Sequence, residues 1–247
     1  MNFTISESSI YLDKILKTLP ATRGIELIVA PPTIALQPLS LQAGAKIKLA
    51  AQNAFYQDYG DFDGETSFAQ LRGLADYCLI GHYERRANFG ENDKMIQKKV
   101  AAAIRNGITP ILCVGEIEPE RASLETADVI RDQVLGALAN LSADDVEKVI
   151  IAYEPVWAIS SAKSAKLASP FEVEDAVKLI RGNIEEVYGK KAAENIAILF
   201  GGSVNPDNAR AYLNINGVNG LMFGKASLIL SEFCDIVRIA NQIAAWG

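Results

Sequence analysis

Glu154 is the residue of this sequence whose position best suits proton transfer. It directly follows the apolar segment 148–153, whose β-branched and aromatic residues are typical of a strand. Pro155 comes next, and because proline has no N–H to donate to a sheet, the strand should end there. A carboxylate at the end of a buried strand is poorly solvated. We therefore expect the pKa of Glu154 to be raised, which suits a general base. The alternative is a strand-end acid paired with a lysine.

His82 is the one histidine of the chain, and it also follows a strand-like segment, 77–81. A short helical segment after it would bring backbone N–H groups near the ring, and these disfavour the imidazolium form. A neutral imidazole can donate a hydrogen bond to a carbonyl oxygen. The alternative is a structural histidine, and its neighbours Glu84, Arg85 and Arg86 would then be a surface ion-pair set.

Glycine-rich turns follow the last two strand-like segments: Gly201-Gly202-Ser203-Val204 and Gly224-Lys225-Ala226-Ser227. Glycine lets the backbone approach an anion closely, and a helix N-terminus adds a favourable dipole. The two turns predict a phosphate site, and the alternative is a pair of ordinary tight turns. The small-residue segment 157–166, which has an apolar stem, could close over a ligand, or it could be a plain flexible connection.

A base, a neutral hydrogen-bond donor and a phosphate site together predict proton transfer beside the carbonyl of a small phosphorylated sugar. Enolisation requires a base for the carbon-bound proton and a donor for the developing enediolate oxygen. Such chemistry requires neither a metal nor a redox cofactor, and we expect none.

Helical and strand-like segments alternate along the chain. The expected strands are 25–30, 47–52, 77–81, 109–114, 148–153, 196–200 and 220–223, and the expected helices are 6–19, 33–43, 67–74, 93–106, 124–138, 171–188, 207–213 and 231–244. Strands that are apolar on both faces indicate a parallel sheet covered by helices. The length favours an α/β fold of the (β/α)₈ TIM-barrel type, with residues 1–247 as a single domain. Seven strands and eight helices are expected, because the chain opens with a helix and the first β-strand is missing.

Bulk composition limits the possible partners and location. The net charge is −6 and no basic run stands out, which argues against nucleic acid or an anionic membrane as partner. Three scattered cysteines favour a reducing cytoplasm over a disulfide-forming compartment. The sequence shows neither an apolar run of membrane-spanning length nor a signal-peptide pattern.

The chain resembles the triosephosphate isomerase family over almost its whole length. The matching segments are Ala51-Gln52-Asn53, Gly64-Glu65, Gly81-His82, Glu84-Arg85-Arg86, Cys113-Val114-Gly115-Glu116, 152–159, 201–204 and 226–228. The resemblance implies an isomerase that interconverts dihydroxyacetone phosphate and glyceraldehyde 3-phosphate in glycolysis and gluconeogenesis. It implies that Glu154 is the base, that His82 is the neutral electrophile and that Glu84 is a carboxylate beside them. The phosphate would be held at Ser160, Gly202, Ser203, Gly224 and Lys225, under a lid that begins at Pro155.

The chain departs from the family pattern at its start. The family begins with a strand ending in Asn-x-Lys-Met-Asn, whose first Asn and Lys line the active site, and here Met1-Asn2 matches only the end of that motif. We expect an N-terminal truncation, either because the start was assigned at an internal methionine, which we favour, or because the natural chain lacks the strand. Without the lysine this chain should be nearly inactive. The alternative function is a non-catalytic phosphate-binding barrel with an assembly or binding role.

Other departures affect the lid, the phosphate site and the assembly. Tyr83 replaces a serine and Lys225 replaces a glycine. The lid is longer than usual, so that either Lys163 or Lys166 matches the family lysine. The resemblance implies a homodimer through loop 53–65, in which Tyr56, Tyr59 and Phe62 offer an aromatic contact surface. A monomer or a different assembly is the alternative, because the pocket that receives this loop would be incomplete.

Overall fold

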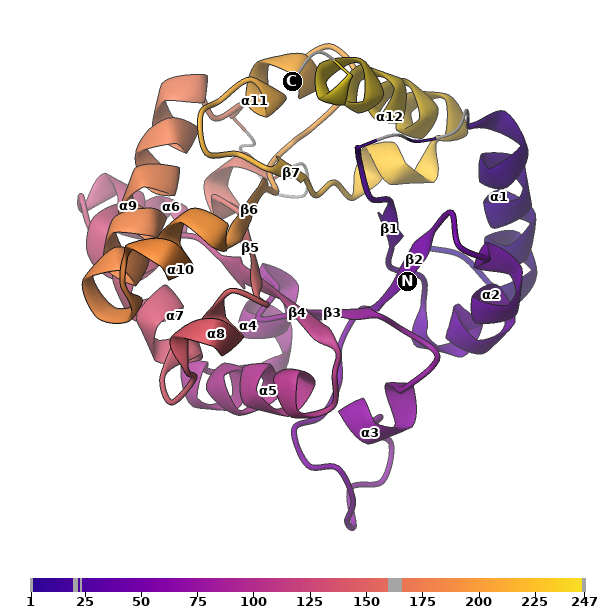
Figure 1. Cartoon of the computed structure of the whole chain (residues 1–247), viewed down its shortest axis with the longest axis horizontal. Coiled ribbons are helices and arrows are strands. Elements are labelled where there is room, and N and C mark those ends of the chain that lie inside the picture. Colours follow the sequence, from indigo (N-terminus) through magenta and orange to yellow (C-terminus); the bar gives the residue numbers. More distant parts are fainter. Residues whose placement is uncertain (1, 20–21, 23, 160–165, 246–247) are drawn as a thin grey trace.

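The computed structural model describes residues 2–19, 22, 24–159 and 166–245. Its strands form one parallel sheet in which each strand pairs with the next along the chain, and the sheet curls inside a ring of helices (Figure 1). The strands are β1 (Ile28–Val29), β2 (Lys48–Ala51), β3 (Tyr77–Ile80), β4 (Thr109–Val114), β5 (Ile150–Tyr153), β6 (Ala197–Phe200) and β7 (Gly220–Leu221). The predicted fold class is confirmed, and each of these strands lies within an expected range.

The eight expected helices are all present in the described chain. They are α1 (Ile5–Thr18), α2 (Leu36–Ala43) with the 3₁₀ turn η1 (Thr33–Ala35), α3 (Phe68–Leu71), α5 (Asp93–Arg105), α7 (Thr126–Leu138), α9 (Pro170–Tyr188), α11 (Ala209–Leu213) and α12 (Leu230–Ala244). Helix α4 (Tyr83–Phe89) is the short helix expected after His82. Three further helices were not predicted: α6 (Glu118–Ala122), α8 (Ala143–Val146) and α10 (Lys190–Asn195). These helices have four to six residues, too few for apolar periodicity to reveal.

Capping residues set where two of the long helices begin. Thr4 accepts a hydrogen bond from the backbone of Glu7, whose carboxylate accepts one in return from the Thr4 backbone. Ser169 and Glu172 form the same reciprocal pair at the start of α9, with Pro170 at the first helical position. These pairs satisfy N–H groups that the helix leaves without a partner, so both starts are encoded locally.

Side chains of the strands alternate between two layers. On β4, Leu112 and Val114 join the large core beneath the helices, whereas Ile111 and Cys113 form a second cluster with Ala152 of β5. This alternation follows from the two-residue period of a strand. Residues packed on the second cluster, such as Leu79 and Leu199, are only partly buried. The inner face of the sheet is therefore less completely covered than its outer face.

The two end strands of the sheet, β1 and β7, are two residues long, and neither pairs with the other in the described chain. This agrees with the expectation that the chain has seven strands, without the first β-strand of the barrel. The helical ring nevertheless continues past both edges, because α1 packs against α2 on one side and α12 on the other (Figure 1). The Tyr11 hydroxyl also donates a hydrogen bond of 2.5 Å to the Ser227 carbonyl beyond β7. Helix α1 thus joins the two edges that the sheet leaves open.

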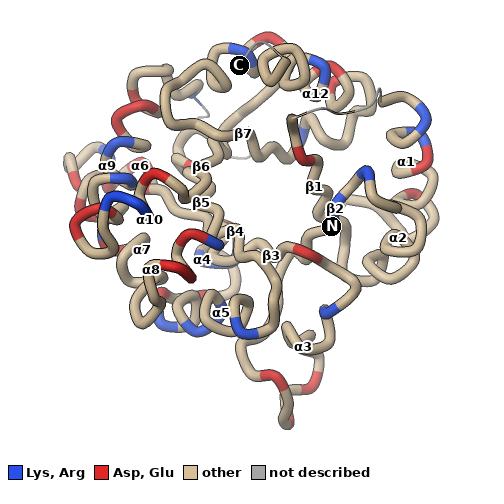
Figure 2. The backbone as a smooth tube through the Cα atoms, in the orientation of Figure 1, with Lys and Arg blue, Asp and Glu red and all other residues tan. Residues whose placement is uncertain are grey.

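Charged residues lie mainly on the outer helices, where acidic and basic side chains are interspersed (Figure 2). Within the described ranges, no helix combines the length and the apolar character needed to cross a membrane.

Candidate active site

The candidate residues follow the C-terminal ends of neighbouring strands. Strand pairing places Ile80 beside Leu112, Val114 beside Tyr153, and Phe200 between Tyr153 and Leu221. The ends of β3 to β7 therefore lie along one rim of the sheet. The residues predicted from separate parts of the sequence share this rim, where parallel barrels carry their active sites.

Glu154 and His82 make direct contact at this rim. The distance from His82 Nε2 to Glu154 Oε1 is 3.3 Å, and the side chains are 26% and 5% exposed. The backbone N–H of Glu154 donates to the Val114 carbonyl at 2.7 Å, and β5 ends one residue earlier, as Pro155 predicted. The base candidate is thus buried and attached to β4 through its backbone.

The hydrogen bonds of His82 indicate which ring nitrogen carries the proton. As the N-cap of α4, its Nδ1 accepts the backbone N–H of Glu84 at 3.4 Å, which leaves Nε2–H directed at Glu154. Burial lowers the pKa of His82, but the hydrogen bond and charge of Glu154, with the charges of Glu84 and Glu91, raise it above its ordinary value. The negative charges of these carboxylates favour the imidazolium form of His82, whereas the helix N–H groups disfavour it. The effect of the carboxylates was not predicted from the sequence.

Glu84, the third catalytic candidate, has an exposed side chain. Its backbone binds His82, and its carboxylate accepts a hydrogen bond from the Tyr83 hydroxyl at 3.4 Å. Its charge therefore reaches His82 from the solvent side of α4.

A buried charge cluster supports the turn that carries His82. Glu91 is fully buried and accepts hydrogen bonds from the Gly81 backbone at 3.1 Å, from Arg85 at 2.5 Å and from Lys99 at 2.7 Å. Lys99 also donates to Asn53 at 2.7 Å. The alternative of a surface ion-pair set is therefore wrong for Arg85, which binds an acid in the interior. Glu91 and Lys99 were not identified from the sequence.

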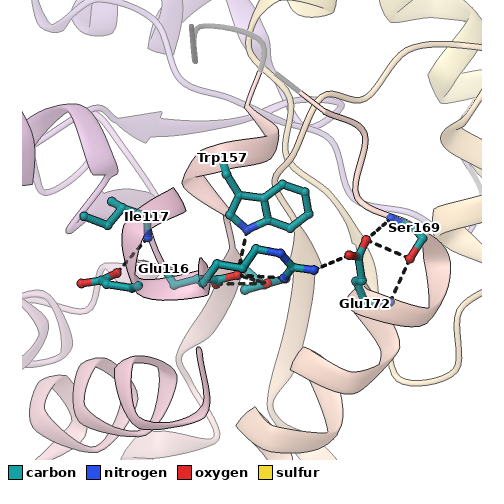
Figure 3. Close-up of polar contacts among 8 residues, drawn as sticks. Glu116, Ile117, Trp157, Ser169 and Glu172 are labelled. Atoms are coloured by element: carbon teal, nitrogen blue, oxygen red, sulfur yellow. Dashed lines mark hydrogen bonds and ion pairs between the residues drawn. The ribbon is translucent and has the colours of Figure 1, made fainter. Parts of the chain in front are cut away.

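A second buried acid, Glu116, anchors the segment that follows Glu154 (Figure 3). Its carboxylate accepts hydrogen bonds from Trp157 Nε1 at 2.8 Å, from the Tyr153 hydroxyl at 3.2 Å and from Arg121 at 3.4 Å. Trp157 belongs to the 3₁₀ turn η2 (Val156–Ala158). The motif Cys113-Val114-Gly115-Glu116 contained this residue, but nothing local in the sequence indicated its partners.

Arg121 joins this anchor to the start of α9. Its guanidinium carbon lies 4.1 Å from the centroid of the Trp157 ring, and the same group pairs with Glu172, which forms the capping box of α9 with Ser169. One arginine on α6 thereby connects the two ends of the segment that the sequence analysis expected to close over a ligand.

The phosphate candidates lie at the ends of β6 and β7. The Ser203 backbone N–H and hydroxyl both donate to the Ala158 carbonyl, at 3.1 and 2.7 Å, which ties the β6 turn to η2. Gly202 is required sterically, because a Cβ atom there would lie 2.4 Å from the ring of Phe200. Gly224 and Lys225 are exposed and begin the 3₁₀ turn η3 (Lys225–Leu228). Ser160 and Lys163 lie outside the described residues.

Two glycines make room for Glu154 itself. A Cβ atom on Gly201 would lie 2.6 Å from Cγ of Glu154, and one on Gly115 would lie 2.0 Å from its carbonyl oxygen. The sequence analysis connected Gly201 with anion binding. The structure shows a further reason for glycine there, because any side chain would displace the carboxylate.

The family model for triosephosphate isomerase matches residues 1–240 of the chain. The chain belongs to the triosephosphate isomerase family. It is 37% identical to the triosephosphate isomerase of Lactiplantibacillus plantarum over 244 residues, which cover 98% of this chain and 96% of that protein. It is 40% identical to the enzyme of Clostridium acetobutylicum over 240 residues, 96% of this chain and 95% of that protein. The resemblance inferred from the motifs is confirmed, and the triosephosphate isomerase family is one of isomerases.

Proposed function

We propose that the site interconverts dihydroxyacetone phosphate and glyceraldehyde 3-phosphate, a reaction of glycolysis and gluconeogenesis. The observation that carries the proposal is the 3.3 Å contact of Glu154 with His82 in a chain of this family. Buried carboxylate and imidazole groups at one rim can serve as the base and the hydrogen-bond donor of an enolisation.

In this mechanism Glu154 removes a proton from the substrate carbon beside the carbonyl. His82 gives its Nε2 proton to the carbonyl oxygen as the enediolate forms and takes up the proton of the neighbouring hydroxyl oxygen, which becomes the new carbonyl oxygen. Glu154 returns its proton to the carbon that held the first carbonyl. Glu84 is the carboxylate that lies beside Glu154 and His82 in this proposal. The phosphate binds at Gly202, Ser203, Gly224 and Lys225, together with Ser160. The transfer begins and ends with the same groups, so it requires no cofactor.

Proton transfer also changes the state of His82. Burial lowers its pKa, and the charge of Glu154 is a main cause of the opposing rise. When Glu154 takes the substrate proton, its negative charge passes to the enediolate oxygen, which lies beside His82 Nε2. The imidazole therefore donates its Nε2–H to the atom on which the charge develops.

We propose that the 247 residues by themselves turn over substrate very slowly. They contain no lysine at the place of the family's first strand, and losing a cation that meets the substrate's charge costs on the order of a thousandfold or more in rate. The open edges of β1 and β7 support this proposal, because no strand of the described ranges lies between them.

A coupled assay of both triose phosphates tests these two proposals separately. The variants are the chain itself, the chain extended upstream of Met1 by a strand segment ending in Asn-Trp-Lys, and the same extension with methionine in place of that lysine. We expect substantial kcat/KM only with the lysine. Comparable turnover by the unextended chain would contradict the proposed inactivity. An extended, folded chain without turnover would contradict the isomerase function and favour the non-catalytic phosphate-binding barrel.

We further infer a homodimer in the cytoplasm, with loop 53–65 at the interface. Tyr59 in this loop is 83% exposed, and the ring of Phe62 packs 4.6 Å from that of Phe55. The cysteines Cys78, Cys113 and Cys234 are buried free thiols, which suits a reducing compartment. Sedimentation of the chain and of Tyr59→Asp tests the assembly. A dimer that Tyr59→Asp leaves intact would exclude this loop as the contact.

A further inference from the structure

The proposed base Glu154 and the nearby Arg86 each have one buried polar atom without a hydrogen-bond partner among the described residues. These atoms are Oε2 of Glu154 and Nη2 of Arg86. Burying a polar group without a partner is unfavourable, and more so if the group is charged, so such atoms in a native fold indicate a partner. Glu154 is a particularly strong case because its side chain is only 5% exposed.

Both residues line the same small cavity. Its volume is about 10 Å³, and its other walls are formed by Gly81, Tyr83, Cys113, Val114, Gly115 and Val156. A single water needs roughly 10–15 Å³ of this kind of space and two or more polar partners. The cavity is therefore of the smallest size that holds one water, and it is far too small for a phosphorylated triose.

The rest of the Arg86 side chain is fixed by other contacts. Its Nε donates to the Gly81 carbonyl at 2.8 Å, and its Nη1 pairs with Asp93 at 2.6 Å. The remaining nitrogen, Nη2, lies 3.2 Å from the position that a Cβ atom on Gly81 would take. Because Gly81 has no side chain, this side of the guanidinium stays open to the cavity.

We propose that one buried water accepts a hydrogen bond from Arg86 Nη2 and donates one to Glu154 Oε2, which makes Arg86 a positioning residue for the base. The inference rests on the proposed role of Glu154 and adds a second support to its carboxylate. Oε1 faces His82, whereas Oε2 is held from the opposite side by the water and the arginine.

Arg86 brings a positive charge to this cavity. The titratable groups that line the cavity or act on its lining are His82, Tyr83, Glu84 and Arg86 around α4, Glu91 after it, and Cys113 on β4. Burial and the neighbouring Glu154 raise the pKa of Cys113 well above its usual value, so its thiol stays neutral. Among the residues that line the cavity, Arg86 is therefore the cation that shares it with the Glu154 carboxylate.

A crystal structure of the chain tests the water directly. We expect density for one water within about 3.2 Å of both Arg86 Nη2 and Glu154 Oε2. The proposal would be overturned if protein side chains filled the cavity and no water density were present. A direct hydrogen bond between the two side chains would also overturn it. This result does not depend on turnover, so it is distinguishable from a failure of the proposed function.

Steady-state kinetics of the chain extended upstream tests the influence of Arg86 on the base. Arg86→Met should lower kcat about tenfold or more and change KM by less than about twofold, because the carboxylate loses a support that positions it. The matched control Asp93→Asn removes the ion pair on the exposed side but keeps Arg86, so it should leave kcat unchanged. Equal losses of kcat in both variants, or none in either, refute the positioning role. If Arg86→Met does not fold, Arg86→Gln replaces it.

Discussion

His82 Nε2 lies 3.3 Å from Glu154 Oε1, although the two residues follow β3 and β5 and the whole of β4 runs between those strands. The contact is possible because β4 presents the small residue Cys113 on this side and Gly115 at its end. Both side chains can therefore reach across one strand at the rim. The contact between the proposed catalytic residues therefore depends on the small residues of a strand that carries neither of them.

Removing either partner of this contact should reduce turnover without unfolding the protein. In the chain extended upstream as described above, we expect His82→Gln and Glu154→Gln each to lower kcat by about 10²–10⁴. Lys94→Gln, an exposed change on α5, is the control and should leave kcat unchanged. A steady-state assay with thermal unfolding as a check on folding measures this. A tenfold loss or less for Glu154→Gln would argue against its role as base.

Gly201→Ala should impair catalysis through a steric effect on the base. The added Cβ atom would lie 2.6 Å from Cγ of Glu154 and 3.1 Å from Cε of Met222, so the carboxylate must move. We expect kcat of the extended chain to fall by about 10² or more, since small displacements of a catalytic group have effects of this size.

Gly136→Ala is the matched control for this glycine substitution. Gly136 lies within α7, where an added Cβ atom meets nothing within 4 Å. The change should stabilise the fold by about 0.5–1 kcal/mol and leave kcat unaltered. Equal kcat values in the two alanine variants would show that the β6 turn relaxes without moving Glu154.

Lys99→Met should strongly destabilise the chain. It leaves Glu91 buried with one cation fewer, and breaking a buried pair in this way costs about 3–5 kcal/mol. Urea unfolding measures the loss. Lys17→Met, which removes an exposed pair with Asp13, should change stability by less than about 1 kcal/mol. The interpretation fails if the two substitutions have similar effects.

Lys99→Met should also change how the free energy of unfolding depends on pH. Burial raises the pKa of Glu91, but hydrogen bonds and charges from Lys99 and Arg85 outweigh it and hold the pKa below its usual 4.5. This contribution is present above pH 4.5 and is lost as the pH falls through the lower folded value. In Lys99→Met the folded pKa rises, so acid destabilisation should begin at a higher pH. If the free energy of unfolding of Lys99→Met depends on acidic pH in the same way as that of the unchanged chain, Lys99 does not hold down the pKa of Glu91.

Arg121→Met should affect both stability and turnover. Glu116, which is fully buried, loses one donor, and the link from Trp157 to Glu172 is broken. Because Arg121 is 33% exposed, we expect a cost of only about 1–2 kcal/mol in urea unfolding. In the extended chain, kcat should fall because the two ends of the segment around the site are no longer connected.

Arg131→Met is the control for Arg121. Arg131 pairs with Glu186 on the surface at 4.0 Å, and its loss should change unfolding by less than about 0.5 kcal/mol with no effect on kcat. If Arg121→Met resembles this control, Arg121 has no special role in joining η2 to α9.

Much of the fold follows from local sequence. The apolar segments predicted each described strand, and caps such as Thr4 and Ser169 set where helices begin. The expected range coincides with the observed strand at β4, but the other expected ranges were longer, most clearly at 25–30, where β1 has two residues. Apolar patterns show which residues are buried, but a strand also needs a neighbour for its hydrogen bonds, and β1 has one on a single side.

The sequence alone determined the order of strands and helices, the family motifs and the candidates Glu154, His82 and the two glycine turns. Each of these depends on residues close together in the chain. Only the tertiary structure decided that Glu91 and Glu116 are buried acids with cations beside them, that Gly201 makes room for the base, and that Arg86 and Glu154 share a cavity. The physical reason is that burial and pairing of charges are set by segments distant in sequence, which meet only when the sheet curls.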